Sequence, residues 1–205
     1  MPMLIDLSHT VRHQTPVFPG DEPVVLEKTR ALAADGYTDW RFCTGMHAGT
    51  HIDGPGHLTD SPGLLSDLPP ERFVGPGYLV DARGRAIDQD LLVGMPQGVG
   101  QIVLVLTGWD KKFGSDAYFA EHPVLTEAFA RELVRRKVLM LGIDFFSPDR
   151  VPFAIHRLLL GGGVLLVENL TNVDRLLAAE KFTIFALPIK TATDSAPARV
   201  VALLS

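Results

Sequence analysis

The feature that most constrains the fold of this chain is a set of short runs in which successive residues are apolar. Residues 102–106 (Ile-Val-Leu-Val-Leu) and 164–167 (Val-Leu-Leu-Val) are the clearest examples. Because side chains alternate between the two faces of a strand, an uninterrupted apolar run predicts a strand that is covered on both faces. Strands are expected at residues 3–7, 24–27, 77–80, 102–106, 138–143, 164–167, 183–187 and 199–203.

Helical signals lie mainly in the second half of the chain. Thr126 can cap a helix over residues 126–137, because its hydroxyl accepts a hydrogen bond from a free backbone N–H of the first turn. Pro152 suits the first turn of a helix over residues 152–160, and residues 172–179 are a third candidate. The chain is therefore expected to form one α/β domain over residues 1–205, with a mixed sheet or partly closed barrel and peripheral helices.

The composition excludes several classes of function. The net charge is −5 and the basic residues are scattered, so no nucleic acid is expected as a partner. The longest nearly apolar run, residues 158–167, is about half as long as a membrane span and contains glycines, so no membrane partner is expected. Residues 1–6 lack the features of a signal peptide, and the single cysteine, Cys43, fits a reducing compartment. These features predict a cytoplasmic protein.

Between residues 45 and 70 the apolar pattern fails, and a long stretch of this kind is usually functional. It contains the segment His47-Ala-Gly-Thr-His51-Ile-Asp53-Gly-Pro-Gly-His57, and neutral imidazoles with carboxylates are ligands of hydrolytic metals. His51 and Asp53 point to one side of an extended backbone, and His47 can approach His51 across a turn. We expect a turn or loop that wraps an ion. The alternative, a polar surface loop with incidental histidines, is weakened because the chain has only seven histidines.

Two residues of the second half could complete such a site. His156 shares a helical face with apolar residues and should point inward. Glu168 directly follows the run 164–167, and α/β sheets place ligands at the C-terminal ends of their strands. Taken alone, His156 fits a packed core histidine better, and Glu168 fits a solvated strand end equally well.

A cysteine or serine nucleophile has less support. Cys43 lies in the alternating stretch 40–44, which indicates a strand, and a lone cysteine there is usually a small packed side chain. Ser147 and Asp149 with a nearby histidine would suggest a serine triad, but the Gly-x-Ser-x-Gly turn that exposes such a serine is missing.

The histidine segment resembles the signature His-x-Gly-Thr-His-x-Asp-x-Pro-x-His of the cyclase-like metal-dependent hydrolases. This family includes isatin hydrolase and bacterial kynurenine formamidase, an enzyme of tryptophan catabolism. The resemblance runs along nearly the whole chain, through the segments Asp6-Leu-Ser8, Thr15-Pro-Val-Phe-Pro-Gly-Asp21, Thr107-Gly-Trp109, Gly142-Ile-Asp144 with Ser147 and Asp149, His156, Glu168-Asn-Leu170 and Pro197-Ala-Arg199.

The resemblance implies a swivelling β/β/α fold, a homodimer or homotetramer, and a divalent metal, zinc in preference to manganese, with one ion or two per subunit. It implies that Asp53 and Glu168 bridge two ions, that His57 accepts and donates the proton, and that Phe18 binds the substrate. The implied metal ligands are His47, His51, Asp53, His156 and Glu168.

The implied activity is hydrolysis of a small aromatic amide, such as an aryl formamide of the N-formylkynurenine type, by metal-activated water. Phe18 stands where formamidases of the family tend to have tryptophan, and Trp40 is a second aromatic residue expected near the pocket. Two enzymatic alternatives remain open, an isatin-type cyclic amide hydrolase and a metal-assisted cyclase or dehydratase. A structural metal-binding protein is the non-enzymatic alternative, and His57 argues against it, because a structural site needs no unligated histidine beside the ion.

Overall fold

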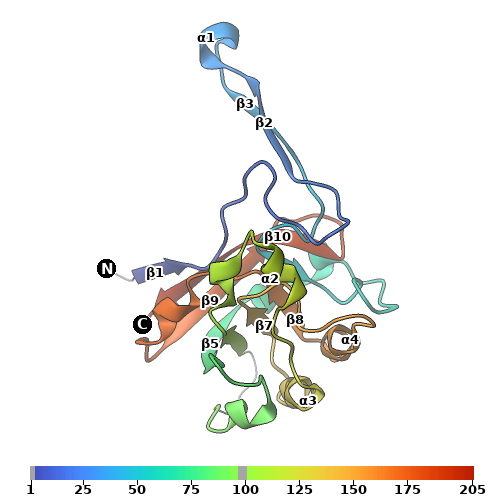
Figure 1. The fold of residues 1–205 in the computed structure, drawn as a ribbon, viewed down its shortest axis with the longest axis vertical. Helices are drawn as coiled ribbons and strands as arrows, with labels where there is room; N and C mark the ends of the chain where they lie inside the picture. The colour runs from blue at the N-terminus through green and yellow to red at the C-terminus, as the bar shows by residue number, and fades with distance from the viewer. Residues whose placement is uncertain (1–2, 97–100) are drawn as a thin grey trace.

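The computed structural model describes residues 3–96 and 101–205 and is built around a closed, mixed β-barrel (Figure 1). Residues 1 and 2, part of the segment considered for a signal peptide, lie outside the described residues. The strands are β1 (Met3–Asp6), β2 (Val25–Arg30), β3 (Asp39–Cys43), β4 (His51–Asp53), β5 (Val74–Asp81), β6 (Ile102–Leu106), β7 (Met140–Ile143), β8 (Leu165–Glu168), β9 (Phe182–Pro188) and β10 (Ser195–Leu204).

The helical elements are short and lie outside the barrel. The α-helices are α1 (Leu32–Asp35), α2 (Asp116–Ala120), α3 (Glu127–Arg135) and α4 (Ala154–Gly161). The 3₁₀ turns are η1 (Leu65–Asp67), η2 (Pro70–Phe73), η3 (Gln89–Leu92), η4 (Trp109–Lys112) and η5 (Val173–Leu176). Within residues 3–96 and 101–205, no helix is long and apolar enough to cross a membrane.

The barrel closes through seven strands in the order β10-β4-β8-β7-β6-β5-β9, because β9 pairs with both β5 and β10. Strands β5 to β8 are parallel to their neighbours in this set, and the remaining pairings are antiparallel. Strand β1 adds to β10 at the outside. The expected α/β domain with a mixed, barrel-like sheet and peripheral helices is confirmed.

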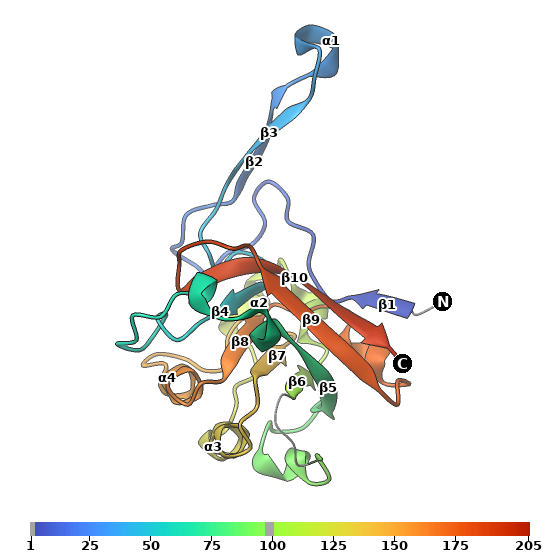
Figure 2. The ribbon, with the colours of Figure 1, turned by 180° about the vertical axis from the view of Figure 1, so that it is seen from behind.

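Two hydrophobic cores explain the uninterrupted apolar runs. In β6, Ile102 and Leu104 belong to the core inside the barrel, while Val103 and Val105 belong to a second core between the sheet and the helices. Helices α3 and α4 cover this outer face, as the view from behind shows (Figure 2). Both faces of the central strands are therefore dry, and all five residues of β6 are buried.

The helix predictions were partly right. The helix capped by Thr126 is present, and its hydroxyl accepts a hydrogen bond from the Phe129 N–H at 3.1 Å. The helix expected from Pro152 starts only at Ala154, because Phe153 has a left-handed backbone with φ of 61° and cannot belong to it. The helix expected over residues 172–179 is wrong, since only the 3₁₀ turn η5 forms there.

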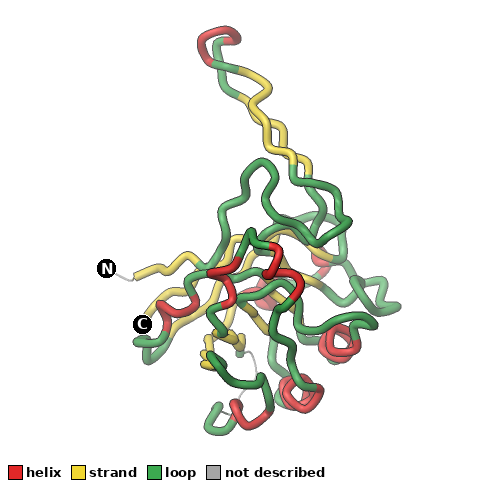
Figure 3. Tube along the Cα trace, in the orientation of Figure 1, coloured by secondary structure: helices red, strands yellow, loops and turns green. Residues whose placement is uncertain are grey.

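Two further expectations are corrected by strands. The histidine segment is not loop alone, because β4 (His51–Asp53) lies between β10 and β8. Strands β2 and β3 form a separate two-stranded hairpin with α1 at its tip, which projects away from the barrel (Figure 3). The strand around Cys43 is confirmed, but its side chain is exposed on this hairpin, so the expected packed cysteine is wrong.

Candidate metal centre

Strand β4 brings the central histidine and aspartate to one side of the barrel wall. His51 and Asp53 are two residues apart on an extended backbone, so their side chains point the same way. His51 lies directly opposite Glu168 in the antiparallel pair of β4 and β8. All three side chains are buried, and the His51 Nε2 atom lies 3.4 Å from Asp53 Oδ1 and 3.3 Å from Glu168 Oε2.

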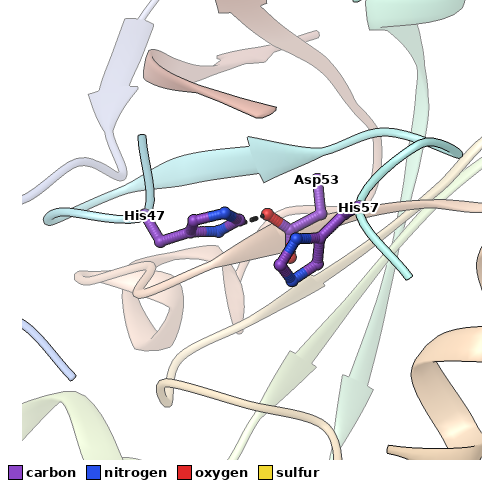
Figure 4. Close-up of side chains that lie close together, drawn as sticks. All are labelled: His47, Asp53 and His57. Atoms are coloured by element: carbon purple, nitrogen blue, oxygen red, sulfur yellow. Dashed lines mark ion pairs between the residues drawn. The ribbon is translucent and has the colours of Figure 1, made fainter. Parts of the chain in front are cut away.

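A turn before β4 returns His47 to the same point. Gly49 has a φ of 64° within this turn, a conformation that glycine adopts at no steric cost. The His47 ring centroid lies 5.0 Å from that of His51, and His47 Nδ1 lies 2.9 Å from Asp53 Oδ1, the ion pair drawn in Figure 4. The predicted convergence of His47 and His51 is thus observed.

The cluster contains buried polar atoms that make no hydrogen bond to any described residue. They are His51 Nε2, both carboxylate oxygens of Asp53 and Glu168 Oε1. An unpartnered buried carboxylate is costly unless it meets a cation. Two sets of donor atoms that could hold an ion share Asp53, namely His47, Asp53 and His57, and His51, Asp53 and Glu168.

The ring nitrogens that face away from the cluster are anchored. His51 Nδ1 lies 2.8 Å from the Gly49 carbonyl oxygen, and His156 Nδ1 lies 2.5 Å from Asp149 Oδ1. Each anchored nitrogen donates its proton outward, which leaves Nε2 of both rings as the free ligand atom. Histidines that bind metals are commonly held in this way by a carbonyl or a carboxylate.

The sequence singled out Asp149 but did not predict its role, which is to anchor His156. The same carboxylate accepts hydrogen bonds from the backbone N–H groups of Ile155 and His156 at 2.6 and 3.2 Å, so it also caps the start of α4. Ser147 Oγ donates to the Asp149 carbonyl oxygen at 2.9 Å. The Asp149 carboxylate does contact a histidine, but the serine hydroxyl faces the backbone, so the structure gives no serine triad here.

The charges in the cluster shift the pKa values of its members. Burial disfavours the charged form of His51, but the carboxylates of Asp53 and Glu168 outweigh it and raise the pKa to about 9. Burial is likewise outweighed at His156, where Asp149 and Glu168 raise the pKa to about 10. Burial raises the pKa of Asp53, but the neighbouring His51 and His47 lower it well below its usual range. The buried carboxylates are therefore stabilised by positive charge nearby, which either protonated histidines or a metal ion can supply.

His57 lies beside this cluster in a different environment. Its ring centroid is 4.2 Å from that of His47, and its Nδ1 atom lies 3.5 Å from Asp194 Oδ2 (Figure 4). Burial lowers the pKa of His57, so the ring is neutral near pH 7. Gly54 permits this arrangement, because a Cβ atom there would lie 2.6 Å from the Asp194 carbonyl oxygen.

The cluster opens into a cavity of about 240 Å³ with an aromatic wall. Phe18 contributes to this wall, and its ring centroid lies 5.7 Å from that of Phe146. Trp40 does not line the cavity, because it lies on the projecting hairpin, so its predicted place near the pocket is wrong. The residues that line the cavity are Pro16, Val17, Phe18, Asp21, His47, His51, His57, Leu58, Phe119, Phe146, Ser147, Phe153, His156, Glu168 and Asn169.

The fold and the site define an α/β barrel with a buried cluster of metal-ligand type, and comparison with known proteins identifies the family. Residues 5–150 match the model of the Cyclase family, described as Putative cyclase, and the chain belongs to this family. Kynurenine formamidase of Salinibacter ruber is 30% identical over 97% of this chain and 96% of its own. Isatin hydrolase of Roseibium aggregatum is 28% identical over 92% and 84%.

The fold has close counterparts among solved structures. An isatin hydrolase bound to the product analogue thioisatinate superimposes with a TM-score of 0.89 and is 23% identical, over 99% of this chain and 92% of that chain. The barrel and its peripheral helices are therefore the fold of this group of enzymes.

Proposed function

We propose that the protein is a metal-dependent amidohydrolase that cleaves a C–N bond other than a peptide bond in a small aromatic amide. One observation carries this proposal: four buried polar atoms of His51, Asp53 and Glu168 lack a hydrogen-bond partner among the described residues, and His51 and Glu168 line a cavity with an aromatic wall. Such a set of imidazole and carboxylate donors suits a divalent metal with hydrolytic chemistry.

The residues that would hold the metal are His47, His51, Asp53, His156 and Glu168. Asp53 lies beside His47 in one set of donor atoms and beside His51 and Glu168 in the other, which supports a bridging role between two ions. Glu168 supports a second bridge, because its two oxygens face different histidines, Oε2 toward His51 and Oε1 toward His156, each at 3.3 Å. Nitrogen and oxygen donors of this kind favour zinc, with manganese as the alternative.

A bound divalent metal supplies hydroxide at neutral pH and polarises a carbonyl group. His57 then acts as the general base and acid, taking a proton from the attacking water and returning it to the leaving nitrogen. Three features support this role: the ring lines the cavity, its lowered pKa keeps it neutral, and Asp194 lies beside Nδ1. Nε2 is then the nitrogen that exchanges protons.

The cavity wall supports an aromatic substrate. Phe18, Phe119, Phe146 and Phe153 line it, and an aromatic ring gains about 0.5–1.5 kcal/mol from such contacts beyond simple burial. The lining contains carboxylates but no lysine or arginine among the described residues, which disfavours an anionic substrate. An aryl formamide of the N-formylkynurenine type is the substrate class we favour.

A cyclic amide of the isatin type is the second candidate, favoured by the similarity to isatin hydrolase over most of both chains. It requires the same ligands and the same proton transfers. A metal-assisted cyclase or dehydratase would use the cluster to polarise a carbonyl without net addition of water. We also propose a cytoplasmic location and a homodimer or homotetramer, as expected from the sequence.

The test is a substrate panel assayed with one preparation in two states. Aryl formamides, cyclic aryl amides and small aliphatic amides are offered to protein stripped by exhaustive chelation and to the same protein reloaded with zinc or manganese. We expect hydrolysis of aromatic amides by the reloaded protein alone. A cyclic amide should give one product heavier than the substrate by one water, and an aryl formamide should give an arylamine and formate whose masses add up to the substrate plus one water. Full activity of protein shown to be metal-free would refute the metal role, and products without added water would favour the cyclase reading.

A further inference from the structure

Asn169 directly follows the proposed metal ligand Glu168 and belongs to a hydrogen-bond network that the proposed reaction does not use. Asn169 is buried, and its backbone has a left-handed φ of 56°, a conformation that asparagine adopts more readily than most residues. Its backbone N–H donates to the Phe145 carbonyl oxygen at 3.0 Å, and its carbonyl oxygen accepts from the Thr50 hydroxyl at 2.6 Å. These bonds fix the backbone of Asn169 at the cavity wall, beside the metal-ligand cluster.

The amide group of Asn169 is held from both ends. On one side, the hydroxyl of the fully buried Tyr118 lies 2.7 Å from Asn169 Oδ1. Burial raises the pKa of Tyr118, so the phenol keeps its proton and donates it to this oxygen. On the other side, Asn169 Nδ2 donates to the Gly49 carbonyl oxygen at 2.9 Å. A carbonyl oxygen can only accept, so a reversed amide would bring two oxygen atoms together, and only one orientation satisfies both ends.

The position of the Tyr118 hydroxyl is itself fixed by packing. The Tyr118 ring meets Phe113 and Phe119 edge-on, with ring centroids 5.2 and 5.3 Å apart. The Trp109 Nε1–H donates to the Tyr118 carbonyl oxygen at 3.1 Å and so holds the backbone of α2. Replacing Tyr118 by phenylalanine therefore removes one hydrogen bond to Asn169 and keeps the contacts of the ring.

The Gly49 carbonyl oxygen joins this network to the metal-ligand cluster. It accepts from Asn169 Nδ2 at 2.9 Å and lies 2.8 Å from His51 Nδ1, and its two lone pairs allow both bonds. The two nitrogen atoms are 3.5 Å apart, as two donors that share one acceptor. His51 Nδ1 therefore carries a proton, and in the neutral ring Nε2 is the unprotonated nitrogen that faces Asp53 and Glu168.

The anchor of His51 needs more support than the anchor of His156. His156 is held by the Asp149 carboxylate, which is charged and is fixed by two backbone N–H groups at the start of α4. His51 is held by a neutral carbonyl at Gly49, which has a φ of 64°, and glycine has more backbone freedom than any other residue. The bond from Asn169 restrains the direction of this carbonyl.

We infer that Tyr118 and Asn169 are positioning residues for His51. Through the Gly49 carbonyl they fix the tautomer and the direction of the His51 ring, so that Nε2 meets the ion; this inference rests on the metal site of the proposed function. The loss of a group that orients a metal-binding histidine typically lowers metal affinity about 10- to 100-fold. Neither side chain belongs to the two sets of donor atoms, so both act on the ion through His51.

The first experiment measures the zinc affinity of the full chain by competition with a chromophoric chelator. Asn169→Ala should bind zinc about 10- to 100-fold more weakly than the native chain, and Tyr118→Phe about 10-fold more weakly, because its Asn169 amide is held from one end only. Asn172→Ala is the control for the first variant, because Asn172 also has a left-handed φ, 58°, and also donates its amide to a backbone carbonyl, that of Asp6. Tyr78→Phe, at a half-buried tyrosine of β5, is the control for the second. Both controls should bind zinc like the native chain.

The second experiment observes the two anchored rings directly by nuclear magnetic resonance. In zinc-loaded protein with ¹⁵N-labelled histidine, the Nδ1–H protons of His51 and His156 should exchange slowly with water, because both rings are buried and hydrogen-bonded. Asn169→Ala and Tyr118→Phe should speed the exchange at His51 and leave His156 unchanged. His156 is the internal control, because a general loosening of the fold would change both signals.

Native zinc affinity in both Asn169→Ala and Tyr118→Phe would overturn the inference. So would a lowered affinity with an unchanged His51 signal, or with equal changes at His51 and His156, because either result would give the two residues a purely structural role. Neither readout depends on amide cleavage. Variants that behave as expected in a chain that cleaves no amide would support this inference and contradict the proposed function, and a native chain that binds no zinc would contradict both.

Discussion

At the scale of single residues, the surroundings of each histidine indicate whether it is suited to bind a metal or to transfer a proton. His51 and His156 are buried against carboxylates, and their outer nitrogens are anchored to Gly49 and Asp149. His57 is about one quarter exposed and has a lowered pKa. The sequence could predict the donor types because they fall within eleven residues. It could not predict the anchors, because Asp149 is an ordinary loop aspartate until the fold places it beside His156.

The first prediction distinguishes the role of His57 in proton transfer from the role of Asp53 in metal binding. His57→Ala should keep its metal and lose a factor of about 10² to 10⁴ in kcat, since only general acid–base catalysis is removed. Asp53→Ala should lose metal as well as activity, because Asp53 belongs to both sets of donor atoms. Metal analysis of both purified variants, beside their kinetics, checks this. Equal loss of metal in the two would make His57 a ligand.

The second prediction concerns Phe18, which is 45% exposed at the cavity wall and contacts Phe146. Phe18→Ala should raise KM for aromatic amides more than for small aliphatic amides, because stacking is lost while the metal chemistry is unchanged. Steady-state kinetics with both substrate types measures the difference. Trp40→Ala is a matched control for the loss of an exposed aromatic side chain outside the cavity. An equal rise for both substrate types would make Phe18 a packing residue only.

At the scale of elements, the sequence predicted the apolar strands well and the polar ones poorly. Strand β6 was recognisable because every one of its residues is apolar, a consequence of burial on both faces. Strand β4 was missed because only Ile52 of its three residues is apolar, although the alternation of His51 and Asp53 around it was a usable signal. The start of α4 was misplaced because Phe153 has a left-handed backbone with φ of 61°, a conformation that is uncommon for a residue other than glycine and that the sequence does not indicate.

The third prediction concerns Asp149 and helix α4. The Asp149 carboxylate caps the start of this helix and also anchors His156, the proposed metal ligand on it. Asp149→Asn should keep the cap of α4 but weaken the anchor of His156, lowering metal affinity about 10- to 100-fold. Asp149→Ala should in addition cost about 1 kcal/mol of stability through the lost cap. Thr126→Ala is the control, because it removes the cap of α3 away from the cluster. Calorimetric titration of metal into each Asp149 variant measures the affinity. A native metal affinity in Asp149→Ala would contradict the proposal that Asp149 anchors a metal ligand.

At the scale of the whole molecule, the cluster joins parts of the chain that are distant in sequence. His51 lies on β4, His156 on α4 and Glu168 on β8, and His47 precedes β4. A bound ion would therefore link two strands of the barrel wall to a helix of the outer layer. No sequence pattern shows that residues 47–57, 156 and 168 meet, because the pairing of β4 with β8 brings them together.

The fourth prediction is that metal removal lowers the thermal stability of the whole domain. A ligand that binds only the folded state adds about 2.7 kcal/mol when present at a hundred times its Kd. For a chain of this length that corresponds to a rise in Tm of roughly 5–10 °C. Scanning calorimetry of chelated and reloaded protein measures the shift. His57→Ala should retain it and Asp53→Ala should lose it, and an unchanged native Tm would argue against a site that joins these elements.

The last prediction concerns how the thermal stability of the metal-free and metal-loaded protein depends on pH. In the metal-free protein the pKa values of His51 and His156 are raised from 6.5 to about 9 and about 10 by the carboxylates around them. A raised histidine pKa stabilises the fold fully below pH 6.5, and this contribution is lost as pH rises through the folded values. The Tm of the metal-free protein should therefore fall between pH 6.5 and 9.

Metal binding requires the unprotonated rings and releases their protons, so the gap between the metal-loaded and metal-free Tm should widen over the same range. His57→Ala should show the same widening. A gap that narrows with rising pH would mean that these two histidines do not compete with protons for the metal.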